Sequence, residues 1–242
     1  MEQIRARVDQ IVKDPKTAAA LKPYYPYGCK RPCFHDEYLP TFNKSHVTLV
    51  DTAPLGVTEI NERGVVHEGR EYPLDVLIYA TGFQWMATST FNMITGPDGQ
   101  TLQDKWKQNG TKTFLGLHSH GFPNLFIISG PQGGGGQFNF TRVIDAHADY
   151  VVWMLKTLKD KGATTVDIKE DAENAYATHC READINTQPL RDCISYYNGH
   201  GDGEPGSLAY YGGAKKWHEK RIEAQESICL LYTSDAADDG VG

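Results

Sequence analysis

The segment 75–83, with the sequence DVLIYATGF, constrains the fold of this chain more than any other stretch. An acidic residue precedes a short and nearly uninterrupted apolar run, which is typical of a strand buried on both faces of a parallel sheet. The run ends at Thr81 and Gly82, where glycine permits a tight turn or a close approach of the backbone to a ligand. Ligands of parallel sheets bind at the carboxyl ends of the strands. The segment therefore predicts a buried parallel strand followed by a ligand-contacting turn, although an ordinary core strand has the same pattern.

The composition indicates a globular chain. With 242 residues, of which 40% are hydrophobic, the chain can bury a sizeable core as one large domain or as parts of two. No apolar run approaches the roughly 18 residues that a membrane span requires, and no apolar signal region follows the first residues. We therefore expect a cytoplasmic protein without a membrane partner.

Charge and cysteine usage exclude two further classes of function. The net charge of −7 argues against nucleic acid as a partner, because phosphate backbones are bound by basic patches. The five cysteines are odd in number, and their spacing matches neither a disulfide framework nor a zinc site. No bound metal is therefore expected.

Residues 229–242 are set apart from the rest of the chain. They begin CLLYTSDAAD, which looks like the translation of a sequencing-library adaptor. We interpret this tail as an artefact and exclude it from the expected fold. The interpretation implies that the chain is a fragment of a longer protein.

The first part of the chain predicts helices, a loop and an antiparallel meander. Apolar positions in residues 1–20 suit one helix face, which Pro15 interrupts. Three prolines and a glycine make residues 23–32 a loop, in which Lys30 and Arg31 are adjacent. These two cations are either solvated surface or a contact for a polyanion. Strand patterns follow at residues 47–51, 57–60, 64–67 and 70–72, with turns between the last three.

The second part predicts a strand, a glycine-rich turn and a helix. The apolar residues 125–129 lead into residues 130–136, with the sequence GPQGGGG. A helix follows, with one apolar face from Val143 to Leu158 and a stop at Gly162. Backbone N–H groups in such a turn and at a helix N-terminus can face a ligand, but a flexible loop has the same composition. The G-x-G-x-x-G at residues 201–206 follows no apolar strand, so it is interpreted as a loop.

In order and spacing, these segments resemble the C-terminal half of Baeyer-Villiger monooxygenases over about residues 5 to 225. The segments that carry the resemblance are GCKRP at 28–32, DVLIYATGF at 75–83, GFPNLF at 121–126, GPQ at 130–132 and SYYNG at 195–199. The resemblance implies an α/β fold, a partial two-dinucleotide-binding-domain flavoprotein fold with a parallel sheet and an antiparallel meander, whose N-terminal half is missing. It also implies three parts: residues 1–83 from the NADP-binding domain, including the meander, residues 84–228 from the FAD-binding domain with the substrate-pocket loop, and the artefact tail 229–242.

The same resemblance implies an activity. Such enzymes use FAD, NADPH and O2 to convert ketones into esters or lactones through a flavin peroxide. Arg31 matches the active-site arginine, whose guanidinium stabilises an anion without readily giving up a proton. Lys30 matches the lysine that binds the 2′-phosphate of NADPH. Six further positions match cofactor contacts: the domain crossing at Thr81 and Gly82, the contacts of the flavin ring at Gln132, Asn139 and the backbone of Phe140, and in addition Tyr196.

Two alternatives stay open. A flavin monooxygenase that oxygenates nitrogen or sulfur has the same Ala-Thr-Gly-Phe turn at residues 80–83, whereas Lys30-Arg31 and the GPQ loop favour the Baeyer-Villiger type. A degenerate flavoprotein fragment would act only as a binding module. Both phosphate-binding G-x-G-x-x-G turns are expected upstream of Met1, so this chain alone is not expected to hold FAD or to be active.

Overall fold

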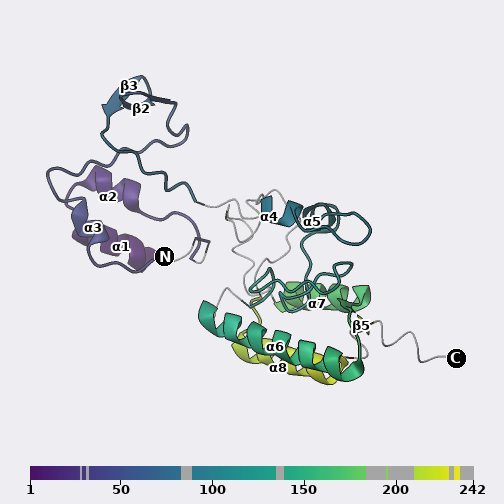
Figure 1. Cartoon of the computed structure of the whole chain (residues 1–242). Coiled ribbons are helices and arrows are strands. Elements are labelled where there is room, and N and C mark those ends of the chain that lie inside the picture. The colour runs from purple at the N-terminus through teal and green to yellow at the C-terminus, as the bar shows by residue number, and fades with distance from the viewer. Residues whose placement is uncertain are drawn as a thin grey trace. The chain divides into compact units, whose positions relative to one another are not determined.

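The structure is a computed structural model that describes residues 1–27, 29–30, 33–82, 89–134, 139–183, 195, 210–228 and 232–234 (Figure 1). The chain divides into two compact units, Met1–Phe83 (unit 1) and Gln84–Gly242 (unit 2). This division falls between residues 83 and 84, directly after the Thr81-Gly82 turn. Among the described helices, none is both long and apolar enough to cross a membrane.

Unit 1 begins with α1 (Glu2–Ile11), α2 (Pro15–Leu21) and α3 (Tyr38–Thr41). Pro15 starts α2, where its missing N–H leaves no hydrogen bond unmade, and the Asp14 carboxylate accepts a 2.7 Å hydrogen bond from the Thr17 N–H. Val8, Val12 and Ala18 form a small core against Leu21 and Leu39. The predicted helix with an interruption at Pro15 is confirmed.

The predicted meander is also confirmed. Strands β1 (Glu59–Asn61), β2 (Gly64–His67) and β3 (Arg70–Pro73) pair in the antiparallel order β1-β2-β3. Asn61 pairs with Gly64 and His67 pairs with Arg70, so both connections are two-residue turns. Asn61 Oδ1 shapes the first turn by accepting hydrogen bonds from the N–H groups of Arg63 and Gly64. By contrast, residues 47–51 do not form the predicted strand.

The predicted buried strand at residues 75–80 is wrong for this chain. These residues form no strand, and Val76 and Ile78 are 73% and 81% exposed. A parallel strand needs hydrogen-bonded neighbours and cover on both faces, and no described segment pairs with this one. The apolar pattern therefore matches an environment that the described part of the chain does not supply.

Unit 2 is mainly helical. It contains α4 (Ser89–Asn92), α5 (Leu102–Asn109), α6 (Phe140–Lys161), α7 (Glu170–Ala183) and α8 (Ala214–Glu226). Its largest core joins α6, α7 and α8 through apolar side chains that include Tyr150, Met154, Tyr176, Cys180 and Trp217. The long helix α6 lies beside α8 (Figure 1). It ends at Gly162, which adopts a left-handed φ of 68°, as predicted.

A two-stranded ribbon contains the last described residues of the chain. Strand β4 (Val166–Ile168) pairs antiparallel with β5 (Tyr232–Ser234). Residues 232–234 belong to the tail interpreted as an adaptor translation, so this pairing involves residues that were not expected to pack.

Cys29 is disulfide-bonded, and the expectation that the cysteines form no disulfide is therefore wrong at this residue.

The predicted strand at residues 125–129 is wrong. Two loops that contact each other form this part of unit 2 instead. We define them as the 113–118 loop and the 127–134 loop. The Ile127 N–H donates to Leu117 O at 2.7 Å, and the Gly130 N–H donates to Gly116 O at 3.0 Å. The apolar run thus pairs with another loop, because no described strand lies beside it. A methyl group on Gly116 would lie 2.2 Å from the Gly133 Cα, so the backbones are in direct contact.

A buried ion pair anchors the segment that follows. The Lys105 ammonium on α5 lies 2.9 Å from a carboxylate oxygen of Glu173 on α7, and the two residues are 9% and 2% exposed. Lys105 also donates to Ser119 Oγ and to the carbonyl of His120. Glu173 accepts from Ser119 Oγ and from the His120 N–H. Each charge is therefore hydrogen-bonded, as burial of a charge requires.

We expect Gly116→Ala to destabilise unit 2 more than Gly162→Ala. Both glycines have a left-handed φ, of 74° and 68°, which costs alanine about 1 to 2 kcal/mol. Only the methyl group of alanine at position 116 would meet backbone atoms, since a methyl group at position 162 would have no neighbour within 4 Å. Overpacking should add about 1 to 3 kcal/mol. Urea unfolding of both variants measures the difference, and equal losses would contradict the close contact of the two loops.

Candidate functional site

The start of α6 carries two of the predicted cofactor residues. Asn139 precedes the helix, and its Oδ1 accepts hydrogen bonds from the Thr141 N–H at 3.0 Å and the Thr141 hydroxyl at 2.6 Å. Phe140 is the first helical residue and is 54% exposed. The first turn has no acidic side chain, so the positive end of the dipole of this 22-residue helix is not neutralised there. The N-terminus of α6 can therefore interact favourably with an electron-rich group.

Gln132, the third predicted cofactor residue of unit 2, is only 2% exposed. Its Oε1 accepts from the Thr113 N–H at 3.0 Å, and its Nε2 donates to Thr111 O at 3.3 Å. Its backbone has a left-handed φ of 63°, which is uncommon outside glycine. The side chain is thus used to fasten the 127–134 loop.

Thr113 and Tyr176 hold the same loop and were not singled out from the sequence. The Thr113 hydroxyl donates to Pro131 O at 2.6 Å, and the Tyr176 hydroxyl donates to Gln132 O at 2.9 Å. Burial raises the pKa of Tyr176, so its hydroxyl keeps the proton that it donates. No sequence signal identifies either contact, because the partners are 18 and 44 residues apart in the chain.

The remaining predicted site residues do not lie in unit 2 or are not described. Lys30, Thr81 and Gly82 belong to unit 1, and all three are exposed. Gly82 has a left-handed φ of 89°, which suits the predicted turn. Arg31 and Tyr196 lie outside the described residues. The structure thus brings Gln132, Asn139 and Phe140 into one unit and Lys30, Thr81 and Gly82 into the other.

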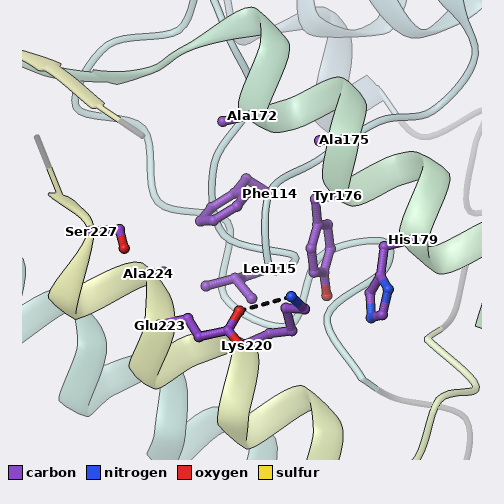
Figure 2. Close-up of a pocket in the computed structure, with 10 residues that line it drawn as sticks. All are labelled: Phe114, Leu115, Ala172, Ala175, Tyr176, His179, Lys220, Glu223, Ala224 and Ser227. Atoms are coloured by element: carbon purple, nitrogen blue, oxygen red, sulfur yellow. Dashed lines mark hydrogen bonds and ion pairs between the residues drawn. The ribbon is translucent and has the colours of Figure 1, made fainter. Parts of the chain in front are cut away.

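A pocket of about 230 Å³ lies between α7, α8 and the 113–118 loop (Figure 2). Its walls are mostly apolar and include Phe114, Leu115 and Ala224, while Lys220 and Glu223 form a 2.8 Å ion pair at its edge. Tyr176 lines it and contacts Phe114 edge to face, with ring centroids 5.4 Å apart. The Tyr176 hydroxyl therefore connects the pocket wall to Gln132.

Two buried histidines of unit 2 have lowered pKa values. Burial lowers the pKa of His118 to about 3 and that of His147 to about 4. A hydrogen bond with the Leu115 carbonyl raises the pKa of His147, but burial outweighs it. Both imidazoles are therefore neutral at physiological pH. Within the described ranges, no three His, Cys, Asp or Glu side chains gather as a metal site.

These pKa values predict a stability that falls with acid. Both folded-state values lie below the ordinary value of 6.5, so the unfolded chain binds more protons as the pH drops. The stabilisation is complete above the pKa of the unfolded state and is lost as the pH falls towards the pKa values of the folded state. We expect the free energy of unfolding to decrease by about 2 to 4 kcal/mol between about pH 7 and about pH 5.

Urea unfolding across this range measures the decrease. The variant His118→Phe removes one of the two groups and should show roughly half of the fall. A free energy of unfolding that stays constant over the same range would mean that these imidazoles titrate in the fold as they do in the unfolded chain.

Known proteins with a similar sequence or structure indicate the family to which this site belongs. No family model matches the chain. A Baeyer-Villiger monooxygenase from Streptomyces coelicolor is 43% identical over 226 residues, which cover 90% of this chain and 37% of that protein. The solved polycyclic ketone monooxygenase of Thermothelomyces thermophila is 34% identical with a TM-score of 0.82, over 97% of this chain and 39% of that one. A structure titled OTEMO complex with FAD and NADP is 28% identical with a TM-score of 0.85, over 96% and 43%.

The likeness extends over almost the whole chain, but the chain spans only about 40% of the length of these relatives. The fold is accordingly part of a flavoprotein fold of this type. The chain is a homologue of the Baeyer-Villiger monooxygenases, to which it corresponds over that part of their length.

Proposed function

We propose that this chain is part of a flavin-dependent monooxygenase that uses NADPH and O2 to convert ketones into esters or lactones. The observation that carries the proposal is the 43% identity to a Baeyer-Villiger monooxygenase over 90% of this chain. In the reaction, one oxygen atom of O2 is inserted between the carbonyl carbon and its neighbour. The other atom leaves as water, with the two electrons coming from NADPH and the balancing proton from solvent. The partners are a small ketone and O2.

Unit 2, up to residue 228, is assigned to the FAD-binding domain, and FAD when bound supplies the redox and oxygen-activating chemistry. Gln132, Asn139 and the backbone of Phe140 would hold its ring system. Asn139 and Phe140 fit a flat, electron-rich group because the N-terminus of α6 has no acidic side chain and Phe140 is exposed. The helix N-terminus would stabilise negative charge on the ring edge.

Unit 1 is assigned to the NADP-binding domain, including the meander. The exposed ammonium of Lys30 would bind the 2′-phosphate of NADPH as a point charge. The exposed turn at Thr81 and Gly82 would carry the chain between the two domains while contacting cofactor. Its left-handed glycine permits a close approach of the backbone.

Arg31 is assigned as the catalytic residue and Tyr196 as a further cofactor contact, on the strength of the family motifs. Negative charge builds up on the ketone oxygen as the carbonyl is attacked. A guanidinium that remains protonated stabilises this charge without becoming a proton donor. Arg31 would therefore lower the barrier of the oxygen insertion itself.

A rival assignment, oxygenation of nitrogen or sulfur, shares the Ala-Thr-Gly-Phe sequence at residues 80–83. Product analysis of the full-length enzyme that contains this chain separates the two. We expect a ketone to yield an ester or lactone with one NADPH consumed per product. An amine N-oxide or a sulfoxide as the main product would contradict the proposal. If NADPH does not reduce the bound flavin, the protein is a binding module.

Replacing Lys30 and replacing Arg31 in that full-length enzyme should impair different steps of the reaction. Lys30→Ala should raise KM for NADPH far more than KM for NADH, because only NADPH carries the 2′-phosphate. Arg31→Ala should leave NADPH binding intact and lower kcat for ester formation by about 10² to 10³.

The matched control is Lys44→Ala, which removes another exposed lysine of unit 1. It should change neither constant. Equal KM changes for both nucleotides in Lys30→Ala, or a normal ester yield in Arg31→Ala, would contradict the corresponding assignment.

A further inference from the structure

His147 reaches two loops from the middle of α6. Its side chain is fully buried, and its Nδ1 accepts a 2.9 Å hydrogen bond from the Ser129 N–H. Its Nε2 lies 3.1 Å from Leu115 O. An amide N–H can only donate and a carbonyl can only accept, so Nδ1 carries no proton and Nε2 carries one. The two contacts together specify a single neutral tautomer.

Both backbone segments that His147 binds are strained. Leu115 and Ser129 have left-handed φ values of 56° and 57°, which cost a residue with a side chain about 1 to 2 kcal/mol each. Such conformations persist where surrounding contacts hold them. The imidazole supplies one contact to each, and it packs closely enough that a methyl group on Gly133 would lie 3.1 Å from its Cε1.

His147 also ties these loops to the helix whose first turn forms the candidate site. It follows Phe140 by two helical turns on α6. Gln132, three residues after Ser129, is fastened by Thr113, two residues before Leu115. One side chain therefore connects both the 113–118 and the 127–134 loop to α6, two turns after its first residue.

We propose that His147 is a positioning residue for oxygenation: it holds the backbone of residues 129–134 against the start of α6, where the flavin ring would contact both. This inference rests on the proposed function, because a positioning role needs a reaction to position. His147 acts through the loop and does not touch the reacting atoms.

The surroundings of His147 keep it in the required neutral form. Burial and the Arg221 guanidinium on α8 both lower its pKa, and Trp217 on α8 packs against it with ring centroids 5.4 Å apart. His118, whose own pKa is lowered by burial and by His147, faces it from the 113–118 loop. A protonated His147 would lose the acceptor for the Ser129 N–H.

The tautomer can be tested on the 242-residue chain itself. The imidazole ¹⁵N shifts of His147 at neutral pH should report an unprotonated Nδ1 and a protonated Nε2. A protonated Nδ1 would contradict the contacts on which the inference depends. This measurement needs neither cofactor nor activity.

The positioning role is tested in the full-length enzyme with three substitutions. His147→Asn keeps an acceptor facing Ser129, His147→Gln keeps a donor facing Leu115 O, and His147→Leu keeps neither. We expect His147→Leu to lower the ester formed per NADPH consumed and to lower kcat by about 10- to 100-fold, with KM for NADPH unchanged. The Asn and Gln variants should recover part of the loss. The control His218→Asn, at an exposed histidine of α8, should match the wild type.

Three outcomes overturn the proposal in distinguishable ways. A folded His147→Leu enzyme with a normal ester ratio would make His147 a purely structural residue. Should that variant not fold, normal kcat and ester ratio in both the Asn and Gln variants would overturn the positioning role equally. A wild-type enzyme that forms no ester, while the tautomer is as stated, would overturn the proposed function and the positioning role with it.

Discussion

The backbone of the 127–134 loop is held by side chains and by a second loop, and the rest of the candidate site depends on this. His147 on α6 binds Ser129, Tyr176 on α7 binds Gln132 O, and Thr113 binds Pro131 O. In a sheet, neighbouring strands would satisfy these groups. Here the positions of α6 and α7, fixed by their common core, are transmitted to the loop by individual hydrogen bonds. Repacking of either helix would therefore move the site.

The buried Lys105–Glu173 pair has a comparable role for the neighbouring segment. Buried ion pairs add little net stability, but removing one partner typically costs about 3 to 5 kcal/mol because a charge is left unpaired. Here the pair and its hydrogen bonds connect α5, residues 119–120 and α7. The His120 ring also contacts Ile168 O at 2.7 Å, which links this cluster to β4. The polar network thus specifies how loops and helices of unit 2 are arranged.

Local sequence patterns predicted the elements whose neighbours are close in sequence. The interruption at Pro15, the meander and the end of α6 at Gly162 depend on residues within a few positions of each other. Residues 75–80 and 125–129 have strand patterns, but a strand also needs a partner strand, which a single segment does not encode. The motif at 130–132 located the loop, whereas the inward direction of the Gln132 side chain depends on Thr113, 19 residues away. No local pattern distinguishes His147 from any packed helical histidine, because its partners are 18 and 32 residues distant.

If side chains preform the loop, it should be rigid before any cofactor binds. Hydrogen exchange of the 242-residue chain tests this most directly at the amides of Ile127, Ser129 and Gly130, which donate to Leu117 O, His147 Nδ1 and Gly116 O. We predict protection comparable to that of the central turns of α6, because opening these amides requires separating the loops from the helix core. Exchange at the rate of an unstructured peptide, with α6 still protected, would contradict a loop that is preformed by its side-chain contacts.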